Sequence, residues 1–374
     1  MSELQLKDLY KGFRAPEVIQ GFAKLIEEDA KKLPHPINIM EVCGGHTHTI
    51  MKYGLLQLLP ENINFIHGPG CPVCIMPKER IDHAYILAMQ EDVILVTLGD
   101  MIKVPGSKGS LQDARAKGAD VRFVYSPLDT LKIAKENPDK TIIFFAIGFE
   151  TTTPMTAALL DVVVKQDIKN IFFHINHVTV PEAMELLLSD KECSIDAFLG
   201  PSHVSVISGS QIYEKFPREY KKPVVVSGFE PVDVMESISM IVKQFVQNRS
   251  ELEVQYKRAV NREGNVKAQE LNDRYFEKAE HFRFRGLGDI PEGGLQLRDE
   301  YRDYNAEVVY KDLLGSEPID DHKLCICGDI LKGKAKPPQC SIFGTLCKPS
   351  SPIGSCMVSS EGSCAAYYKY GNLL

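Results

Sequence analysis

The chain has 374 residues, of which 44% are hydrophobic and 25% are charged, a composition that is ordinary for a globular protein with several buried cores. Its net charge of −7 argues against a nucleic-acid partner, which would favour a concentrated basic face. Residues 1–13 are polar, and no segment offers the roughly eighteen uninterrupted apolar residues of a membrane span. We therefore expect no signal peptide, no membrane partner and a cytoplasmic location.

Short apolar runs alternate with amphipathic stretches over the first 250 residues. The runs are rich in Val, Ile and Phe with little polar alternation, which is typical of strands buried on both faces. They predict strands over 37–42, 63–67, 93–98, 121–125, 141–147, 171–175, 197–200 and 223–229. The stretches between them predict helices, among others over 16–33, 79–90, 154–166 and 232–247. This alternation indicates an α/β fold with mainly parallel sheets flanked by helices.

These strands exceed what one small sheet usually holds, so we predict two α/β lobes. A polar turn, KENPDK, places the boundary near 130–140 and gives predicted domains 1–135 and 136–250. Residues 250–282 are strongly charged and predict a solvated helical connector. With that connector, residues 251–374 form a third predicted domain, partly helical and partly irregular.

Six of the ten cysteines crowd this C-terminal part, at 325, 327, 340, 347, 356 and 364. In a reducing compartment such cysteines are more often metal ligands or reactive thiols than disulfides. Only Cys325 and Cys327 are close in sequence, unlike the paired knuckles of zinc sites, whereas wide spacings permit thiolates to converge on an iron–sulfur cluster. A bound metal would supply the folding energy that the sparse apolar content lacks.

The motif CGGHTH begins with Cys43, which ends a predicted strand and precedes a predicted helix. A thiol at a helix N-terminus meets the positive end of the peptide dipoles, so we expect a lowered pKa and a thiolate. His46 is the better second ligand or proton partner of Cys43, and we expect His48 to be structural.

The motif HGPGCPVC, residues 67–74, carries a C-x-x-C pair after another predicted strand. Such a pair is compatible with a zinc half-site, an iron ligand pair or a redox dithiol. Ligand sites in parallel sheets form at the carboxyl ends of strands, so Cys43, Cys71 and Cys74 are expected to meet at one crevice.

The same rule places four polar residues of the second lobe at the equivalent edge, facing that crevice: Glu150, His174, His177 and His203. Each is as compatible with a capping or core polar group as with a functional one. The sequence contains no G-x-G-x-x-G motif and no Walker loop, so a nucleotide site is unsupported.

Together, CGGHTH (43–48), GPGCPVC (68–74), GFETTTP (148–154), PSHVSVI (201–207) and the tail 325–368 resemble the HypD family of hydrogenase maturation factors. The resemblance spans almost the whole chain, with the motifs in the same order. It implies two α/β domains and a third domain with a [4Fe-4S] cluster. It also implies an accessory scaffold, in place of a turnover enzyme, that assembles the Fe(CN)2CO unit of [NiFe] hydrogenases with HypC and HypE.

The resemblance also implies roles for particular residues. Cys43 would be the thiolate that holds the Fe(II) carrying cyanide and carbonyl, assisted by a cysteine of HypC, and Cys71 and Cys74 would be a redox dithiol beside it. We group His46, Glu150 and His203 with these reactive residues. The implied cluster ligands are Cys325, Cys340, Cys347 and Cys364, separated by 14, 6 and 16 residues. Cys327 and Cys356 are extra thiols, and either can replace a neighbour.

The main alternative is a thiol–disulfide oxidoreductase of the ferredoxin–thioredoxin reductase type, in which a [4Fe-4S] cluster feeds electrons to a nearby C-x-x-C pair. The CGGHTH motif argues against it, because a pure disulfide reductase needs no third thiolate. A zinc-dependent hydrolase built on Cys43, His46, Cys71 and Cys74 is disfavoured because four protein ligands would close the site.

Overall fold

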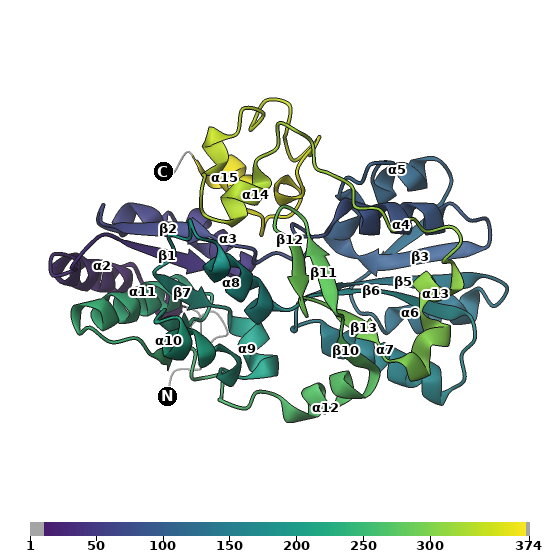
Figure 1. Cartoon of the computed structure of the whole chain (residues 1–374), viewed down its shortest axis with the longest axis horizontal. Coiled ribbons are helices and arrows are strands. Elements are labelled where there is room, and N and C mark those ends of the chain that lie inside the picture. Colours follow the sequence, from purple (N-terminus) through teal and green to yellow (C-terminus); the bar gives the residue numbers. More distant parts are fainter. Residues whose placement is uncertain (1–10, 372–374) are drawn as a thin grey trace.

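The computed structural model describes residues 11–371 and contains two parallel sheets that lie side by side (Figure 1). The first sheet has the order β2-β1-β7-β8-β9, with β1 (Ile37–Glu41), β2 (Ile63–His67), β7 (Ala197–Gly200), β8 (Val224–Val226) and β9 (Leu252–Val254). The second has the order β4-β3-β5-β6, with β3 (Val93–Leu98), β4 (Asp120–Val124), β5 (Thr141–Gly148) and β6 (Ile171–His177). All the predicted strands are present, and the prediction of parallel sheets is confirmed.

The helices cover these sheets and connect their strands up to residue 246, and those from residue 266 onward follow the last strand of the two sheets. They are α2 (Pro16–Ala30), α3 (Gly44–Lys52), α4 (Lys78–Ala88), α5 (Leu111–Ala116), α6 (Asp129–Glu136), α7 (Thr153–Lys165), α8 (Val180–Ser189), α9 (Ser202–Ser208), α10 (Lys215–Glu219), α11 (Pro231–Val246), α12 (Val266–Tyr275), α13 (Ala306–Val309), α14 (Cys327–Leu331) and α15 (Ser363–Tyr370). Short 3-10 turns are η1 (Gly12–Arg14), η2 (Leu55–Leu58), η3 (Gly99–Lys103), η4 (Gln211–Tyr213), η5 (Asp299–Tyr304), η6 (Pro337–Gln339) and η7 (Ser355–Met357). Both α2 and α11 begin with proline, whose fixed φ suits the first helical position.

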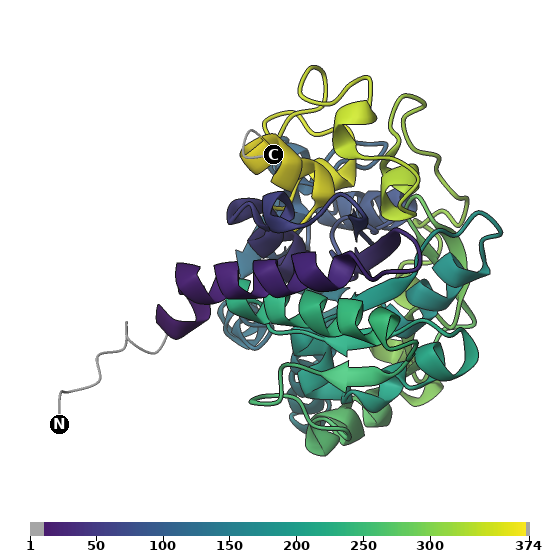
Figure 2. The same ribbon diagram turned by 90° about the vertical axis from the view of Figure 1, so that its left-hand side faces the viewer.

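The core of the first lobe lies between its sheet and the helix pair α2 and α11, which run side by side in Figure 2. Ile26 of α2 and Ile238 of α11 are buried against Ile39 and Val225 of the sheet. Burial of each such side chain contributes about 1.5–3 kcal/mol of hydrophobic free energy. The apolar faces of the two helices thereby fix the sheet that carries the first cysteine motifs.

The sheets divide the chain differently from the predicted domains. Strands β7, β8 and β9 extend the first sheet because β7 pairs with β1, so residues 197–254 belong beside the N-terminal strands. The predicted boundary near 135 falls between β4 and β5, which both flank β3 in the second sheet. Local sequence cannot reveal this return, because strand pairing is decided by side-chain burial between segments far apart in the chain.

The predicted helical connector, 250–282, is wrong for most of its length. Only α12 is helical there, preceded by β9 and followed by β10 (Phe276–Lys278) and β11 (His281–Phe284). These last strands form two small antiparallel sheets with β13 (Leu295–Leu297) and β12 (Gly288–Pro291), respectively. Tyr275 and Phe276 are buried in the second lobe, so apolar anchoring there outweighs the charged, helix-favouring composition.

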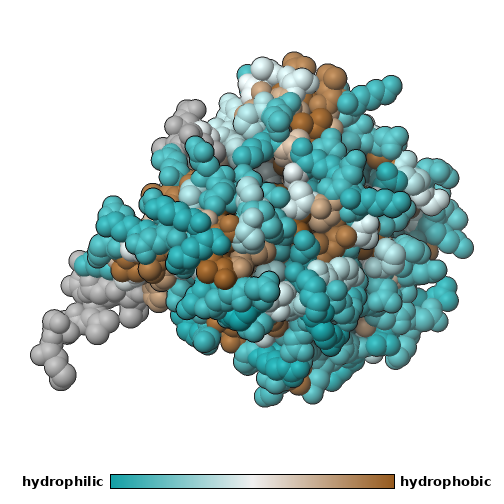
Figure 3. Space-filling view, turned by 60° about the vertical axis from the view of Figure 1, so that its left-hand side comes forward, coloured by the Kyte–Doolittle hydropathy of each residue, from teal (hydrophilic) through white to brown (hydrophobic). Residues whose placement is uncertain are grey.

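The cysteine-rich tail, residues 325–371, lies over the first sheet and its helix α3, at the top of Figure 1. No helix between residues 11 and 371 is long and apolar enough to cross a membrane. Hydrophilic side chains cover most of the face drawn in Figure 3, with small hydrophobic patches between them. Most of the polar N-terminal stretch 1–13 lies outside the described residues.

Candidate metal and thiol site

The two sheets point the carboxyl ends of their strands into one shared cleft of about 680 Å³. Its walls are the loops that follow β1, β2, β3, β5, β6, β7 and β8, completed by residues 359–361 of the tail. The expectation that ligand sites form at strand ends therefore correctly located this cleft. The cysteine and histidine side chains that line it are Cys43, His48 and His203.

Cys43 lies on the wall of the cleft. Its loop, which follows β1, packs backbone to backbone against the loop that follows β2. The Gly44 N–H donates to the Gly70 carbonyl oxygen at 3.0 Å, and a Cβ on Gly70 would lie 2.5 Å from the Cys43 Cα. Only glycine fits at position 70, because the contact is with main-chain atoms that cannot rotate away. The two cysteine motifs are thus locked together, although of the three cysteines expected at one crevice only Cys43 lines the cleft.

Behind Cys43 lies a buried carboxylate, Glu41. One of its oxygens accepts the Cys43 N–H at 2.8 Å, and the other accepts from the Thr47 hydroxyl and contacts His67 Nδ1 at 2.8 Å. Such a network satisfies the buried charge and fixes both strand ends. It holds the Cys43 loop in position from the side opposite the cleft.

The expected low pKa of Cys43 is wrong. Burial raises the pKa of this thiol well above its usual value, and Glu361 and Glu41 add to the rise, while the N–H groups of Gly45 and His46 oppose it only in part. Loss of hydration outweighs the favourable end of α3. In the free chain Cys43 is therefore a thiol, poised to lose its proton when a cation arrives.

The two histidines of CGGHTH lie differently from expectation. His46 is buried, and its Nε2–H faces the carbonyl oxygens of Gly228 at 3.0 Å and Ser227 at 3.3 Å, so the ring is tied to the loop after β8. His48, which we expected to be structural, lines the cleft instead. Burial lowers the pKa of both imidazoles, so both are neutral near pH 7.

Cys71 and Cys74 are buried beneath the cleft, while Pro72 and Val73 between them form part of its wall. A turn in which the Cys74 N–H donates to the Cys71 carbonyl oxygen at 3.0 Å brings the two thiols into contact. The thiols face the tail, because Cys74 also contacts Cys356. The pair therefore sits between Cys43 and the C-terminal cysteines.

The tail gathers a continuous set of thiols around Cys327. Its sulfur contacts those of Cys325, Cys356 and Cys364. A Cβ on Gly354 would lie 2.7 Å from the Cys327 sulfur and 2.8 Å from that of Cys325, so this glycine makes room for sulfur. Hydrogen bonds from Cys327 and Cys74 lower the pKa of Cys356 to about 6, which makes it the thiolate of the set.

The remaining predicted cluster residues lie at the edge of this set. Cys347 is buried and accepts the Ile353 N–H at 3.4 Å, within the same apolar core as Cys364. Cys340 is partly exposed, and its thiol donates to the Leu324 carbonyl oxygen at 3.6 Å. The clustered cysteines suggest a metal or iron–sulfur site in this tail.

Glu150 of the GFETT motif lies behind the cleft wall. Its Oε1 accepts the Val180 N–H at 3.0 Å at the start of α8, and burial raises the pKa of the carboxyl to about 8. It is therefore protonated near pH 7. His203 lines the cleft with its ring edge-on to Phe229, at a centroid distance of 4.7 Å, and it extends from the first lobe instead of the second.

Neither β6 histidine lines the cleft. His177 is buried against Gly148 and Thr156, and its Nε2 lies 2.8 Å from the Thr156 hydroxyl. His174 points toward α4 and meets His83. For this strand, the expected grouping at the crevice is wrong, because alternate residues face opposite sides of the sheet.

Two acidic residues of the cleft were not predicted. Asp100 lies two residues after the end of β3, and Glu361 comes from the tail and packs against Gly44. The rule of strand carboxyl ends identifies Asp100 in the run VILVTLGD, whereas Glu361 carries no local signal.

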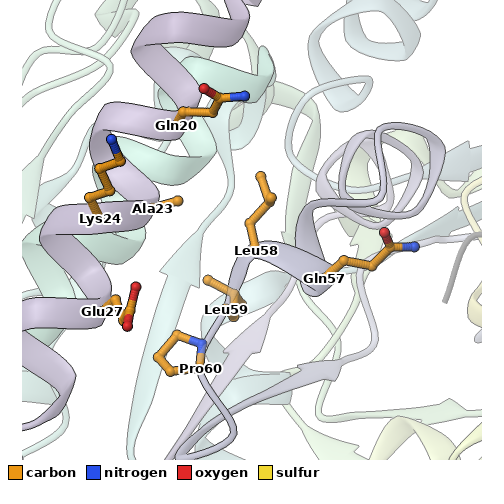
Figure 4. Close-up of a pocket in the computed structure, with 8 residues that line it drawn as sticks. All are labelled: Gln20, Ala23, Lys24, Glu27, Gln57, Leu58, Leu59 and Pro60. Carbon is orange, nitrogen blue, oxygen red and sulfur yellow. The ribbon is translucent and has the colours of Figure 1, made fainter.

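A separate hollow of about 400 Å³ lies between α2 and residues 57–60 (Figure 4). Gln20, Lys24 and Glu27 line it from α2, and Leu58 lines it from the opposite side. Its lining side chains include no thiol and no imidazole, so it lacks the soft donors of the cleft.

Known proteins match the chain over nearly its full length. The family model described as HypD, hydrogenase formation hypA family, matches residues 17–371. Hydrogenase maturation factor HypD2 of Bradyrhizobium diazoefficiens is 48% identical over 368 residues, HypD of Cupriavidus necator 46% over 366, and HypD of Escherichia coli K12 44% over 362. Each alignment covers 96% of both chains. The chain therefore belongs to the HypD family of hydrogenase maturation factors.

Proposed function

We propose that this maturation factor is a scaffold that holds an iron ion through Cys43 while the Fe(CN)2CO unit of a [NiFe] hydrogenase is assembled on it. The observation that carries the proposal is the position of Cys43 on an open cleft whose wall also contains Pro72 and Val73, the residues between the buried cysteines 71 and 74. The iron is cargo, taken up and passed on. Thiolate is a soft donor that suits Fe(II) bearing cyanide and carbonyl, and an open cleft leaves positions for these ligands.

The raised pKa of Cys43 couples the binding and release of iron to the loss and gain of the thiol proton. Without a cation the partly buried thiol keeps its proton, which avoids an uncompensated charge. Binding of Fe(II) displaces that proton, because the metal supplies the missing positive charge. His48 and His203 line the same cleft as neutral imidazoles and can accept the proton.

The buried thiols support an electron path toward this cleft. In the first exchange step, the Cys356 thiolate attacks the Cys74 sulfur of a Cys71–Cys74 disulfide, and Cys71 leaves as a thiolate. Cys327 then attacks Cys356 and releases Cys74, and the thiol proton of Cys327 passes to the departing Cys74 sulfur. Two electrons pass from the Cys327 and Cys356 pair, which becomes a disulfide, to the Cys71 and Cys74 pair, which becomes a dithiol.

The remaining tail cysteines fit an iron–sulfur cluster. Cys325 and Cys364 adjoin Cys327, Cys347 is buried beside them, and Gly354 leaves space for sulfur. A relay role for Cys327 and Cys356 favours Cys325, Cys340, Cys347 and Cys364 as the [4Fe-4S] ligands, with Cys340 turning inward from Leu324. When bound, such a cluster supplies single electrons.

We further propose that HypC and HypE are the partners of this scaffold. An iron held by one protein thiolate at an open cleft has free coordination positions, which a cysteine of HypC can fill. HypE is then the source of the cyanide carbon. HypC and HypE therefore dock at the cleft that carries Cys43.

The test is differential alkylation with mass spectrometry across a redox titration of the anaerobic protein. When the samples are alkylated after denaturation, mild oxidation is expected to protect Cys71 and Cys74 while Cys43 still labels, and reduction of the tail is expected to restore their labelling. Single alanine replacements at either position should stop cofactor assembly and leave the fold intact. Two thiols that label independently at every potential, without a disulfide species, would contradict the redox role.

The connected thiols also favour the alternative function, a cluster-dependent thiol–disulfide oxidoreductase. The two functions differ in their need for Cys43. A disulfide reductase keeps its activity toward a disulfide substrate in Cys43→Ala, whereas an iron-carrying scaffold loses cofactor assembly in that variant.

A further inference from the structure

A second cluster of potential ligands lies away from the cleft, where the second lobe meets the segment that leads to the tail. His83 comes from α4, His174 from β6 and Glu307 from α13. One ligand atom of each lies within 4.8 Å of those of the other two, and both histidines are buried. Three different elements thus supply one small group of donors, to which the proposed function assigns no role.

The two imidazoles face each other, with one ring nitrogen of each pointing toward the other ring. His83 Nε2–H donates to the Gly315 carbonyl oxygen at 2.6 Å, which leaves a lone pair on Nδ1. That Nδ1 lies 3.2 Å from His174 Nε2. A tetrahedral zinc ion with Zn–N bonds of about 2.0–2.1 Å separates its nitrogen ligands by roughly 3.3–3.4 Å, so the observed spacing is close to that of a zinc pair.

The carboxylate is held in place by independent contacts. Glu307 Oε2 lies 2.6 Å from Arg80 Nη1, and its backbone N–H donates to the Asn305 side chain at 2.9 Å. Asn305 also bridges to Phe173, which is adjacent to His174 in β6. The second carboxylate oxygen, Oε1, is thereby left available as a ligand.

The protonation states also suit a metal. Burial lowers the pKa of His174 to about 3, so the ring is neutral near pH 7. Burial opposes ionisation of Glu307, but the Arg80 guanidinium beside it outweighs burial and holds the pKa of this carboxyl below its usual value, so it is a carboxylate. Neutral imidazole and ionised carboxylate are the forms that coordinate metals, so no proton must leave the site.

We propose that His83 Nδ1, His174 Nε2 and Glu307 bind a divalent transition-metal ion of the zinc class, with water as the fourth ligand. Two imidazoles and one carboxylate are a typical zinc donor set with one open position. The ion joins α4, β6 and α13, and so fastens the chain segment that precedes the tail to the second lobe.

Binding requires one rearrangement in the surroundings of His174. The Asn176 amide now donates to His174 Nδ1 at 2.9 Å, which places the ring proton on Nε2. A metal on Nε2 shifts that proton to Nδ1. The Asn176 amide then gives up its hydrogen bond to the His174 carbonyl oxygen at 3.0 Å and turns so that its oxygen, which has no partner now, accepts the proton. Replacing this amide by a carboxylate favours the metal-bound tautomer, as in carboxylate–histidine–zinc arrangements.

The test is a cobalt(II) titration of the anaerobic, cluster-bearing protein, followed by visible spectroscopy. The difference between wild type and His174→Gln isolates this site from the thiols. It should contain the weak d–d bands of a site of nitrogen and oxygen donors, without thiolate-to-cobalt charge transfer. Glu307→Gln, at a partly exposed position, should also lose these bands. His281→Gln, at an exposed position of β11, is the matched control and should keep them.

Asn176→Asp is expected to tighten binding by at least about tenfold, which a purely structural hydrogen bond would not do. Identical cobalt spectra in wild type, His174→Gln and Glu307→Gln would overturn the proposal and leave these side chains as a hydrogen-bonded bridge. Unchanged affinity in Asn176→Asp would likewise contradict the proposed role of Nε2.

Discussion

Gly70→Ala tests whether the two cysteine loops form one rigid unit. The added Cβ would lie 2.5 Å from the Cys43 Cα and 2.6 Å from its carbonyl carbon. Ordinary contact between carbon atoms requires about 3.5 Å, so the loops must separate by about 1 Å. Overpacking of this kind costs about 1–3 kcal/mol, because main-chain atoms cannot rotate out of the way.

The assay is urea unfolding of the anaerobic variant, with the free energy of unfolding compared with that of wild type. The matched control is Gly21→Ala in the middle of α2, where a Cβ meets nothing within 4 Å. That change should raise stability by about 0.5–1 kcal/mol, because alanine favours the helix. Gly70→Ala should also reduce iron retention, since it displaces Cys43. An unfolding free energy equal to that of wild type would refute the close packing of the loops.

Three further predictions concern the buried acid and the thiols. Glu150 keeps its proton up to about pH 8 when folded but ionises near 4.5 when unfolded, so wild type should lose stability as pH rises between these values. Glu150→Gln should remove this loss, and equal pH slopes in unfolding experiments would contradict it. Cys327→Ser should block re-reduction of an oxidised Cys71 and Cys74 pair, as measured by alkylation; normal recovery would exclude the relay. Cys347→Ala should remove iron and acid-labile sulfide; retained sulfide would exclude it as a ligand.

Much of the fold was readable from local sequence. Runs such as TIIFFAI are apolar throughout, and this pattern predicted buried parallel strands correctly. The return of residues 197–254 to the first sheet was not predicted, because pairing of β7 with β1 depends on contacts between segments more than a hundred residues apart. The charged stretch 250–282 was misleading, since Tyr275 and Phe276 anchor it in the core.

The sequence predicted where the cleft lies, but it did not predict the protonation state of Cys43 or the positions of the two histidines that follow it. The rule that ligand sites form at the carboxyl ends of parallel strands placed Cys43 and the C-x-x-C loop at one crevice, and Cys43 does line the cleft. The state of Cys43 was predicted wrongly, since a sequence reveals the nearby helix end but not the burial that outweighs it. His46 is buried and His48 lines the cleft, the reverse of the expectation. The reason is that the His46 ring contacts carbonyl groups after β8, which are distant in sequence.

The most direct test of the iron-carrying role is infrared spectroscopy of the anaerobically purified chain, produced together with HypC and HypE. The wild-type chain should show bands of bound cyanide and carbonyl. Cys43→Ala should lack them while its iron–sulfur content stays the same, because the thiolate that holds the cargo is gone. Bands that persist unchanged in Cys43→Ala would contradict the account.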